Sequence, residues 1–161
     1  MIRILAATDF SEEARPVLDF AAQLTQQCGG KMYLLHAVEP CMLDVAGRLT
    51  ADDIPVGFGM VEAVDASLSG QVLAQADIRA KALGEELAAK WNIPIYAKAE
   101  ESDDIVECVH AFCERHAINN LVIGNRHHSL LSSILLGSTA EKLVRAARIP
   151  VTVVPCNPSA Q

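Results

Sequence analysis

The segment from Gly124 to Ser138, GNRHHSLLSSILLGS, holds the residues best suited to chemistry in this chain. It follows an apolar stretch at 118–123 that is typical of a buried strand, and it ends where a helix is expected to begin. We expect Ser138 and Glu141 to form a capping box at that helix N-terminus. Glycine before a helix lets backbone N–H groups approach an anion, and the helix dipole attracts negative charge. The segment therefore predicts a phosphate site.

The same residues have a simpler interpretation. A Gly-Ser pair before a helix is common, and by itself Gly137-Ser138 predicts a capped helix and nothing more. The segment before the pair is long, however, and its second half, 130–136, is mostly apolar. Together with the glycine at its end, these features favour a folded loop that closes over a ligand.

Predicted strands and helices alternate along the chain. Apolar runs and helical spacing predict strands at 2–8, 31–38, 93–99, 118–123 and 149–154, and helices at 11–28, 61–90, 102–116 and 138–147. This alternation predicts an α/β fold in a single domain, 1–161, with a doubly wound five-stranded parallel sheet and helices on both faces. Because crossovers are right-handed, few strand orders are open, and we expect the order 3-2-1-4-5.

Prolines and glycines mark the irregular parts of the chain. Pro16 lies inside the first predicted helix, so we expect an irregular first turn there. Pro94 removes a ladder donor and places the third strand at the sheet edge. Residues 39–60 show no period and form either a lid or a surface excursion. Residues 156–161 form a short tail.

The predicted sheet brings two distant segments to one crevice. In this order the first and fourth strands lie where the winding reverses, and ligands bind there at the carboxyl ends of the strands. Thr8 and Asp9 end the first strand, and Gly124 ends the fourth. Asp9 can accept hydrogen bonds from ribose hydroxyls, while the loop after Gly124 supplies N–H groups to phosphate. The alternative is that Asp9 caps the helix that begins near Ser11.

Composition excludes several classes of protein. The net charge of −7 over 161 residues argues against a nucleic-acid partner, which needs a basic surface. No run approaches the ~18 apolar residues of a membrane span, and we expect no signal peptide. Five cysteines without a CxxC pair fit a reducing cytoplasm.

Known catalytic and metal-binding patterns are also missing from the sequence. It has no Walker motif, GxGxxG or nucleophile elbow, so we expect no catalytic residue and no rapid turnover. The cysteines and histidines that lie close together would spread around a helix, so we expect no metal site; they are Cys108, His110, Cys113 and His116.

Four segments resemble the universal stress protein family: ILAATDFSEEA, LLHAVEP, GNRHHSLLSSILLGSTAEKL and RIPVTVVP. The resemblance covers nearly the whole chain. Its most specific element is the nucleotide loop of the family, which reads Gly, two residues, Gly, nine residues, then Gly followed by Ser or Thr. Gly124, Gly137 and Ser138 keep this spacing, whereas His127 stands in the place of the second glycine.

The resemblance implies a nucleotide site. In the ATP-binding branch of the family, the aspartate after the first strand and the first loop glycine contact the ribose, a backbone position after the second strand holds the adenine, and the remaining loop positions hold phosphates. The residues at these positions here are Asp9, Gly124, Ala37, Gly137, Ser138 and Thr139, with Thr8 lining the same crevice.

Two residues of the loop have open roles. Arg126 adds positive charge toward the phosphates or stays a solvated surface arginine. His127 places a side chain where the backbone must approach phosphate, and its ring either obstructs that approach or donates to the phosphate.

The predicted function is a cytoplasmic stress-response protein that binds ATP or another adenine nucleotide, with or without Mg²⁺, and acts as a binding switch. The alternatives are a nucleotide-free interaction module, which His127 favours, and a slow nucleotide hydrolase in which Asp9 or His127 assists a water molecule. The apolar strand 149–154 is last in the sheet, and the resemblance implies a homodimer through it; otherwise the tail covers this edge.

Overall fold

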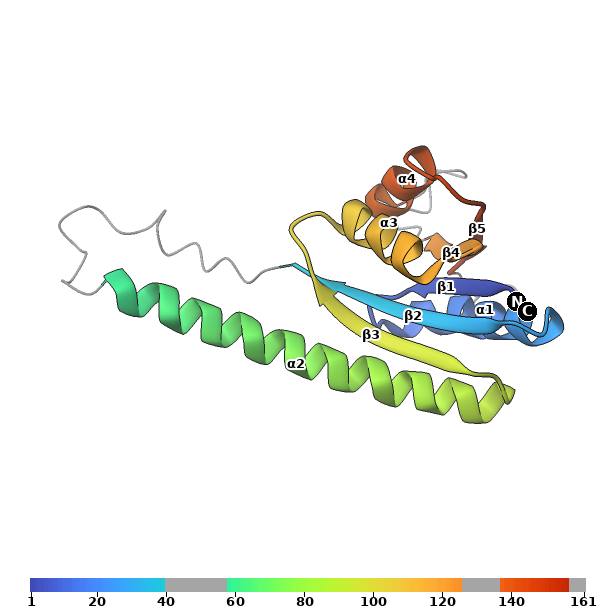
Figure 1. Ribbon diagram of the computed structural model, residues 1–161, viewed down its shortest axis with the longest axis horizontal. Helices are drawn as coiled ribbons and strands as arrows, with labels where there is room; N and C mark the ends of the chain where they lie inside the picture. Colours follow the sequence, from blue (N-terminus) through green and yellow to red (C-terminus); the bar gives the residue numbers. More distant parts are fainter. Residues whose placement is uncertain (40–57, 126–136, 157–161) are drawn as a thin grey trace.

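The computed structural model describes residues 1–39, 58–125 and 137–156, and in the helix at 58–91 it describes side chains from Gly70 onward. The elements in chain order are β1 (Arg3–Ala7), the 3-10 turn η1 (Glu12–Ala14), α1 (Arg15–Gln27), β2 (Lys31–Val38), α2 (Phe58–Trp91), β3 (Ile95–Glu101), α3 (Ile105–His116), β4 (Asn120–Asn125), α4 (Ser138–Arg145) and β5 (Val151–Pro155). The strands pair in parallel in the order β3-β2-β1-β4-β5, which confirms the predicted α/β fold and strand order (Figure 1).

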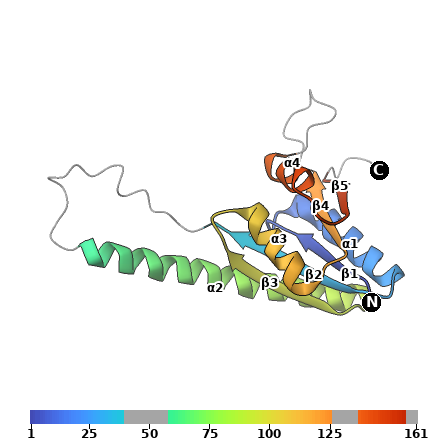
Figure 2. The ribbon, with the colours of Figure 1, turned by 45° about the horizontal axis from the view of Figure 1, so that its top comes forward.

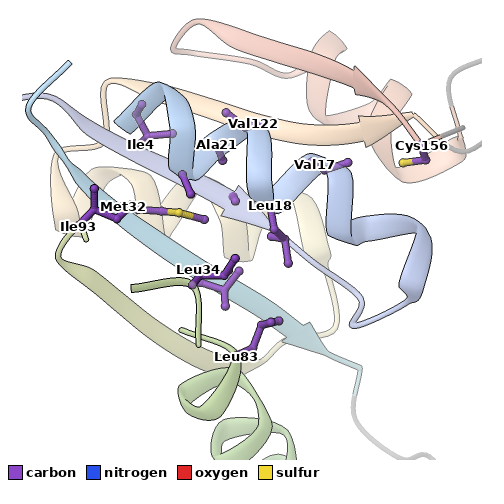
Figure 3. Packing of buried hydrophobic residues seen from close by; sticks show 13 residues of the cluster. Ile4, Val17, Leu18, Ala21, Met32, Leu34, Leu83, Ile93, Val122 and Cys156 are labelled. Carbon is purple, nitrogen blue, oxygen red and sulfur yellow. The ribbon is translucent and has the colours of Figure 1, made fainter. Parts of the chain in front are cut away.

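Helices cover both faces of the sheet (Figure 2). Along β2, Met32 and Leu34 pack into the core beneath α1 and α2, whereas Tyr33 and Leu35 pack into the core beneath α3 and α4. This alternation arises because successive side chains of a strand point to opposite faces. Each face therefore has a core of its own, and Figure 3 shows the core on the α1 and α2 side.

The ends of α1 follow from proline and glycine. Pro16 lies in the first turn of α1, where its missing N–H costs little, and the 3-10 turn η1 precedes it. The predicted irregular first turn is confirmed. After α1, Gly29 has a φ of 60°, and a Cβ on Gly30 would lie 2.6 Å from the carbonyl oxygen of Ile2. Both positions therefore require glycine.

The C-terminal end of α2 is tied to α1 through Asp19. Its carboxylate accepts hydrogen bonds from Lys90 Nζ at 2.7 Å and from the indole Nε1 of Trp91 at 2.9 Å. Partial burial acts to raise the pKa of Asp19, but these two hydrogen bonds outweigh it and lower the pKa. The ionised carboxylate therefore joins the two helices on this face.

Asp77 links α2 to β3. The C-terminal part of the helix runs alongside this strand (Figure 1). The Asp77 carboxylate pairs with Lys81 at 2.7 Å and with Lys98 of β3 at 3.2 Å, and it accepts from Ala99 N at 3.1 Å. The hydrogen bond from Lys81, together with the other donors, holds the pKa of Asp77 at about 2. This contact fixes the rotation of α2 against the sheet.

The predicted capping box at the start of α4 is wrong. Ser138 is the first residue of the helix, and Gly137 is the N-cap, with φ of −58° and ψ of 153°. No described side chain caps this end. The carboxylate of Glu141 accepts from Arg145 Nε at 2.9 Å, one turn along the helix, so this ion pair replaces the expected bond back to Ser138.

The predicted cap of α3 is also misplaced. Asp104 is the N-cap, and its Oδ1 accepts from Val106 N at 2.8 Å and from Glu107 N at 3.2 Å. Ser102 precedes it and accepts from Asp104 N at 3.2 Å. A carboxylate accepts two backbone donors more readily than a hydroxyl, which explains why the N-cap lies two residues later than expected.

Other boundaries differ modestly from expectation. Of the segment predicted to be irregular, 40–57 lies outside the described residues and 58–60 belongs to α2; in the tail, 157–161 also lies outside them. The strands β3, β4 and β5 each begin two residues later than predicted, so Pro94, which was expected within the third strand, precedes β3. The prediction that β3 is an edge strand is confirmed. In the described part of the chain, no helix is both long and apolar enough to cross a membrane.

Candidate functional site

A cavity of about 350 Å³ lies at the carboxyl ends of β1, β2 and β4, beside the start of α4. Of the nine residues predicted for the site, seven line this cavity: Thr8, Asp9, Ala37, Gly124, Gly137, Ser138 and Thr139. The other two, Arg126 and His127, lie outside the described residues. Because β1 and β4 are neighbours in the sheet, segments more than a hundred residues apart meet at this point.

Thr8 is the fixed point on one side of the cavity. Its N–H donates to the carbonyl of Leu35 at 3.0 Å, and its own carbonyl accepts from His36 Nδ1 at 2.8 Å. Its hydroxyl oxygen accepts from the N–H of Phe10 at 3.0 Å. With the side chain also buried, Thr8 holds the start of the loop that carries Asp9.

Asp9 presents an exposed carboxylate at the cavity. Its Oδ1 accepts from the N–H of Ser11 at 3.0 Å and from the Ser11 hydroxyl at 2.7 Å, just before η1 begins. The N-cap of η1 is Ser11, so the alternative interpretation, in which Asp9 itself caps the helix, is not confirmed. Asp9 instead takes part in holding the N-cap residue. A carboxylate has several acceptor positions, so this part is compatible with accepting from a ligand hydroxyl as well.

Gly124 is required by packing. A Cβ at this position would lie 2.6 Å from Cys156 Sγ and 3.2 Å from Val17 Cγ2. Figure 3 shows Val17 on α1 and Cys156 beyond β5 in the core of that face. Glycine thus lets the end of β4 fit against α1 and the chain after β5, while its backbone lines the cavity.

The start of α4 forms the opposite side of the cavity. Gly137, Ser138 and Thr139 line it, and the first helical hydrogen bond runs from Glu141 N to Gly137 O at 2.8 Å. The N–H groups of the first helical turn have no acceptor within the helix, and no described side chain caps them. This arrangement is typical of an anion site.

The cavity combines a largely apolar lining with a few polar groups. Among the described lining residues, Asp9 supplies the one carboxylate, and neither lysine nor arginine contributes. In the described ranges no group of three or more His, Cys, Asp or Glu side chains is placed to hold a metal ion. The cavity therefore offers an acceptor for hydroxyls on one side and N–H donors for an anion on the other.

The thiols of α3 lie away from this cavity. Cys108 and Cys113 are buried in the core of the α3 face. Burial raises the pKa of the Cys113 thiol to about 11, and burial also raises the pKa of Cys108. Both are therefore protonated at neutral pH and behave as small apolar side chains.

The model of the universal stress protein family matches residues 1–155 of this chain. The chain belongs to the universal stress protein family. Among its relatives, the universal stress protein A homolog of Haemophilus ducreyi is 27% identical over 152 residues, which cover 94% of each chain.

Solved universal stress proteins share the fold. UspA from Lactobacillus plantarum has a TM-score of 0.70 at 17% identity, covering 95% of this chain and 97% of its own. A universal stress protein in complex with cAMP has a TM-score of 0.60 at 18% identity (97% and 98% covered). One from Archaeoglobus fulgidus in complex with dAMP has a TM-score of 0.56 at 21% identity (95% and 97% covered). At such identities the likeness concerns the fold alone.

Eleven of the eighteen described lining residues of this universal stress protein were not predicted. Nine of these are alanine or larger aliphatic residues, and the other two, His36 and Cys156, bring a ring nitrogen and a thiol. The signal for His36 was a polar ring within the apolar strand LLHAV, directly before Ala37. Cys156 has no comparable signal. It reaches the cavity because β5 pairs in parallel with β4, and its N–H donates to the carbonyl of Asn125 at 3.1 Å.

Proposed function

We propose that this universal stress protein binds ATP or another adenine nucleotide and acts as a regulatory binding switch in a stress response. One observation carries the proposal: a single cavity joins the Asp9 carboxylate to the uncapped N-terminus of α4. The ribose hydroxyls and the phosphates of a nucleotide suit these two sides. Two proteins of the same fold bind adenine nucleotides, cAMP in one and dAMP in the other, and this supports adenine as the base.

The proposed contacts follow the two sides of the cavity. The carboxylate of Asp9 and the backbone at Gly124 meet the ribose, and the backbone at Ala37, in β2, holds the adenine. The N–H groups at Gly137, Ser138 and Thr139 hold phosphate. From the sequence, Arg126 and His127 add donors to the phosphates.

The lining chemistry favours binding over catalysis. A single carboxylate among the described lining residues gives a Mg²⁺ ion little to bind, so any Mg²⁺ arrives with the nucleotide, held by phosphate oxygens and water. We propose no catalytic residue. Phosphate release at a rate above that of buffer, lost on His127→Ala, would instead establish the slow hydrolase.

Binding is tested on the purified full chain. Small molecules released by denaturation are analysed by mass spectrometry, and ATP, AMP and cAMP are titrated by calorimetry into wild type and His127→Gly. We expect saturable binding of at least one nucleotide, with His127→Gly changing the affinity for ATP more than that for AMP. Glu85→Gln, an exposed change on α2, is the control.

The nucleotide-free interaction module is the second candidate, and His127 is the observation that favours it. No released nucleotide, together with no heat of binding and no thermal shift at millimolar ATP, would decide for the module.

We further propose a cytoplasmic homodimer that pairs through β5. This strand forms one edge of the sheet, its described partner is β4, and Val153 is 37% exposed. An apolar edge of this kind pairs readily with another strand. Light scattering coupled to size-exclusion chromatography should give a mass twice the 17.3 kDa of one chain for the wild type. The Val153→Lys variant should give the mass of a single chain. The free thiols of Cys28, Cys108 and Cys113 suit a reducing compartment.

A further inference from the structure

The backbone directly after Asp9 has an unusual conformation. Phe10 has a φ of 62°, in the left-handed region that side chains other than glycine rarely adopt. Such a conformation persists where contacts around it fix the chain, and it often marks a functional site. Because Phe10 turns the chain between β1 and η1, the contacts that hold Phe10 also set the direction of Asp9.

Arg79 of α2 supplies two of these contacts. Its Nη2 donates to the carbonyl of Phe10 at 3.0 Å, and its guanidinium carbon lies 4.8 Å from the centre of the Phe10 ring. The second contact is a cation–π interaction. The Phe10 ring in turn lies 4.1 Å from the ring of His36 in β2. A chain of contacts thus runs from α2 through Phe10 to the strand beside the cavity.

The chain of contacts closes on Thr8. His36 donates through Nδ1 to the Thr8 carbonyl, and the hydroxyl of Thr8 accepts from the N–H of Phe10. The residue before Asp9 is therefore held by β2, and the residue after it is held by α2. Asp9 lies between two fixed points.

The part of α2 that carries Arg79 is itself fixed against the sheet. Asp77, two residues earlier, bonds to Lys98 and to the backbone N–H of Ala99 in β3. Arg79 is exposed and is not among the described residues that line the cavity. It borders a separate hollow of about 210 Å³ that Phe10 also lines. The contact of Arg79 with the nucleotide site is therefore indirect, through Phe10.

We propose that Arg79 is a positioning residue for the nucleotide site. Through Phe10 it holds the Asp9 carboxylate in the direction needed to accept from ribose hydroxyls. The preference for a complete ribose thereby depends on α2, a helix outside the cavity. The proposal rests on the proposed function, since it assigns Asp9 to the ribose.

The test compares ATP with 2′,3′-dideoxy-ATP by calorimetry on the full chain. We expect Arg79→Ala to weaken ATP binding about two- to fivefold, as loss of an exposed cation–π contact and one hydrogen bond implies, and to leave dideoxy-ATP unchanged. Arg79→Lys keeps the charge but not the planar fork, so it should recover part of the loss. Gln75→Ala, exposed one turn earlier on α2, is the control and should bind both ligands as wild type does.

A double variant separates positioning from a general effect. In Asp9→Ala, adding Arg79→Ala should change ATP affinity no further, and thermal unfolding of each variant shows that it is folded. Equal weakening of ATP and dideoxy-ATP in Arg79→Ala, or unchanged ATP affinity, would overturn the proposal while leaving nucleotide binding intact. Wild-type protein that binds neither ligand would overturn the proposed function, and this inference with it.

Discussion

The two sides of the cavity are built in opposite ways. On the side that we propose for the ribose, the ribose side, which comprises Thr8, Asp9 and Phe10, hydrogen bonds from β2, α2 and Ser11 fix the backbone and the carboxylate. On the side that we propose for the phosphates, the phosphate side, Gly137–Thr139, the helix begins with no cap from a described side chain. On the first side, hydrogen bonds within the protein already hold the polar groups in place. On the second side, the backbone N–H donors are left for a ligand.

This difference separates selectivity from affinity. A fixed acceptor discriminates between ligands that carry a matching hydroxyl and ligands that lack it, because only the former add a hydrogen bond to the carboxylate. Uncapped N–H groups respond to negative charge of any source and weaken as salt rises. We therefore expect the ribose side to choose the nucleotide and the phosphate side to set how tightly it binds.

Removing the acceptor should have the largest effect. Asp9→Ala is expected to lower ATP affinity about 10- to 100-fold, since a hydrogen bond to a charged group contributes about 1.5–3 kcal/mol. Calorimetry measures the affinity. Ser11→Ala is the control, because it removes the hydroxyl at 2.7 Å from Asp9 but keeps the carboxylate. Equal affinities of Asp9→Ala and wild type would show that the carboxylate serves η1 alone.

On the phosphate side, a proline can remove one donor without breaking the helix. Ser138 is the first residue of α4, where proline is tolerated, and the extended backbone at Gly137 suits a following proline. Ser138→Pro should weaken ATP about tenfold and leave adenosine unchanged, whereas Ser138→Ala keeps the N–H and should bind as wild type does. An equal loss of ATP and adenosine would contradict an anion site here.

Gly124, whose backbone we place at the ribose, also tests the packing at the end of β4. Gly124→Ala should lower the free energy of unfolding by about 1–2 kcal/mol, because its Cβ would lie 2.6 Å from Cys156 Sγ. Urea denaturation measures the change. Adding Cys156→Ala removes that sulfur and should recover part of the loss. A single variant as stable as wild type would show that the end of β4 moves freely.

The smallest effect concerns the support of the ribose side by α2. The pKa of Asp77 is about 2 in the folded chain against an ordinary 3.8, so its stabilisation is complete above about pH 4 and lost as the pH falls toward 2. In wild type this should remove about 1 kcal/mol, reduced by solvent screening. Urea unfolding between pH 2 and 5 measures it. In Asp77→Asn this component should vanish; a pH dependence identical to that of wild type would contradict it.

The arrangement of the elements was predictable from the sequence because local patterns determine it. Apolar runs fixed the strands, and right-handed crossovers limited the order, so the meeting of Thr8, Asp9 and Gly124 followed from topology. Helix starts were less predictable. At 102–104 and at 137–141 several polar residues compete for the same donors, and the outcome depends on partners such as Arg145 that a capping pattern ignores.

Contacts that depend on three-dimensional packing were not predictable. Nothing in the sequence around Phe10 indicates a positive φ, and Arg79 lies 69 positions away in a helix whose rotation is set by Asp77. Cys156 likewise enters the cavity through strand pairing. The predicted site residues were those with a local or family signal, and the residues that orient them came from the fold.

The bond between Trp91 and Asp19 gives this protein a built-in optical reporter. Trp91 is the one tryptophan of the sequence, and it lies where α2 ends, before β3 begins, while the cavity lies at the opposite ends of the strands. Its emission therefore records the docking of α2 on α1 without interference from a bound base. A change in fluorescence on adding nucleotide would therefore report a change in the packing of α2 rather than contact between the nucleotide and Trp91.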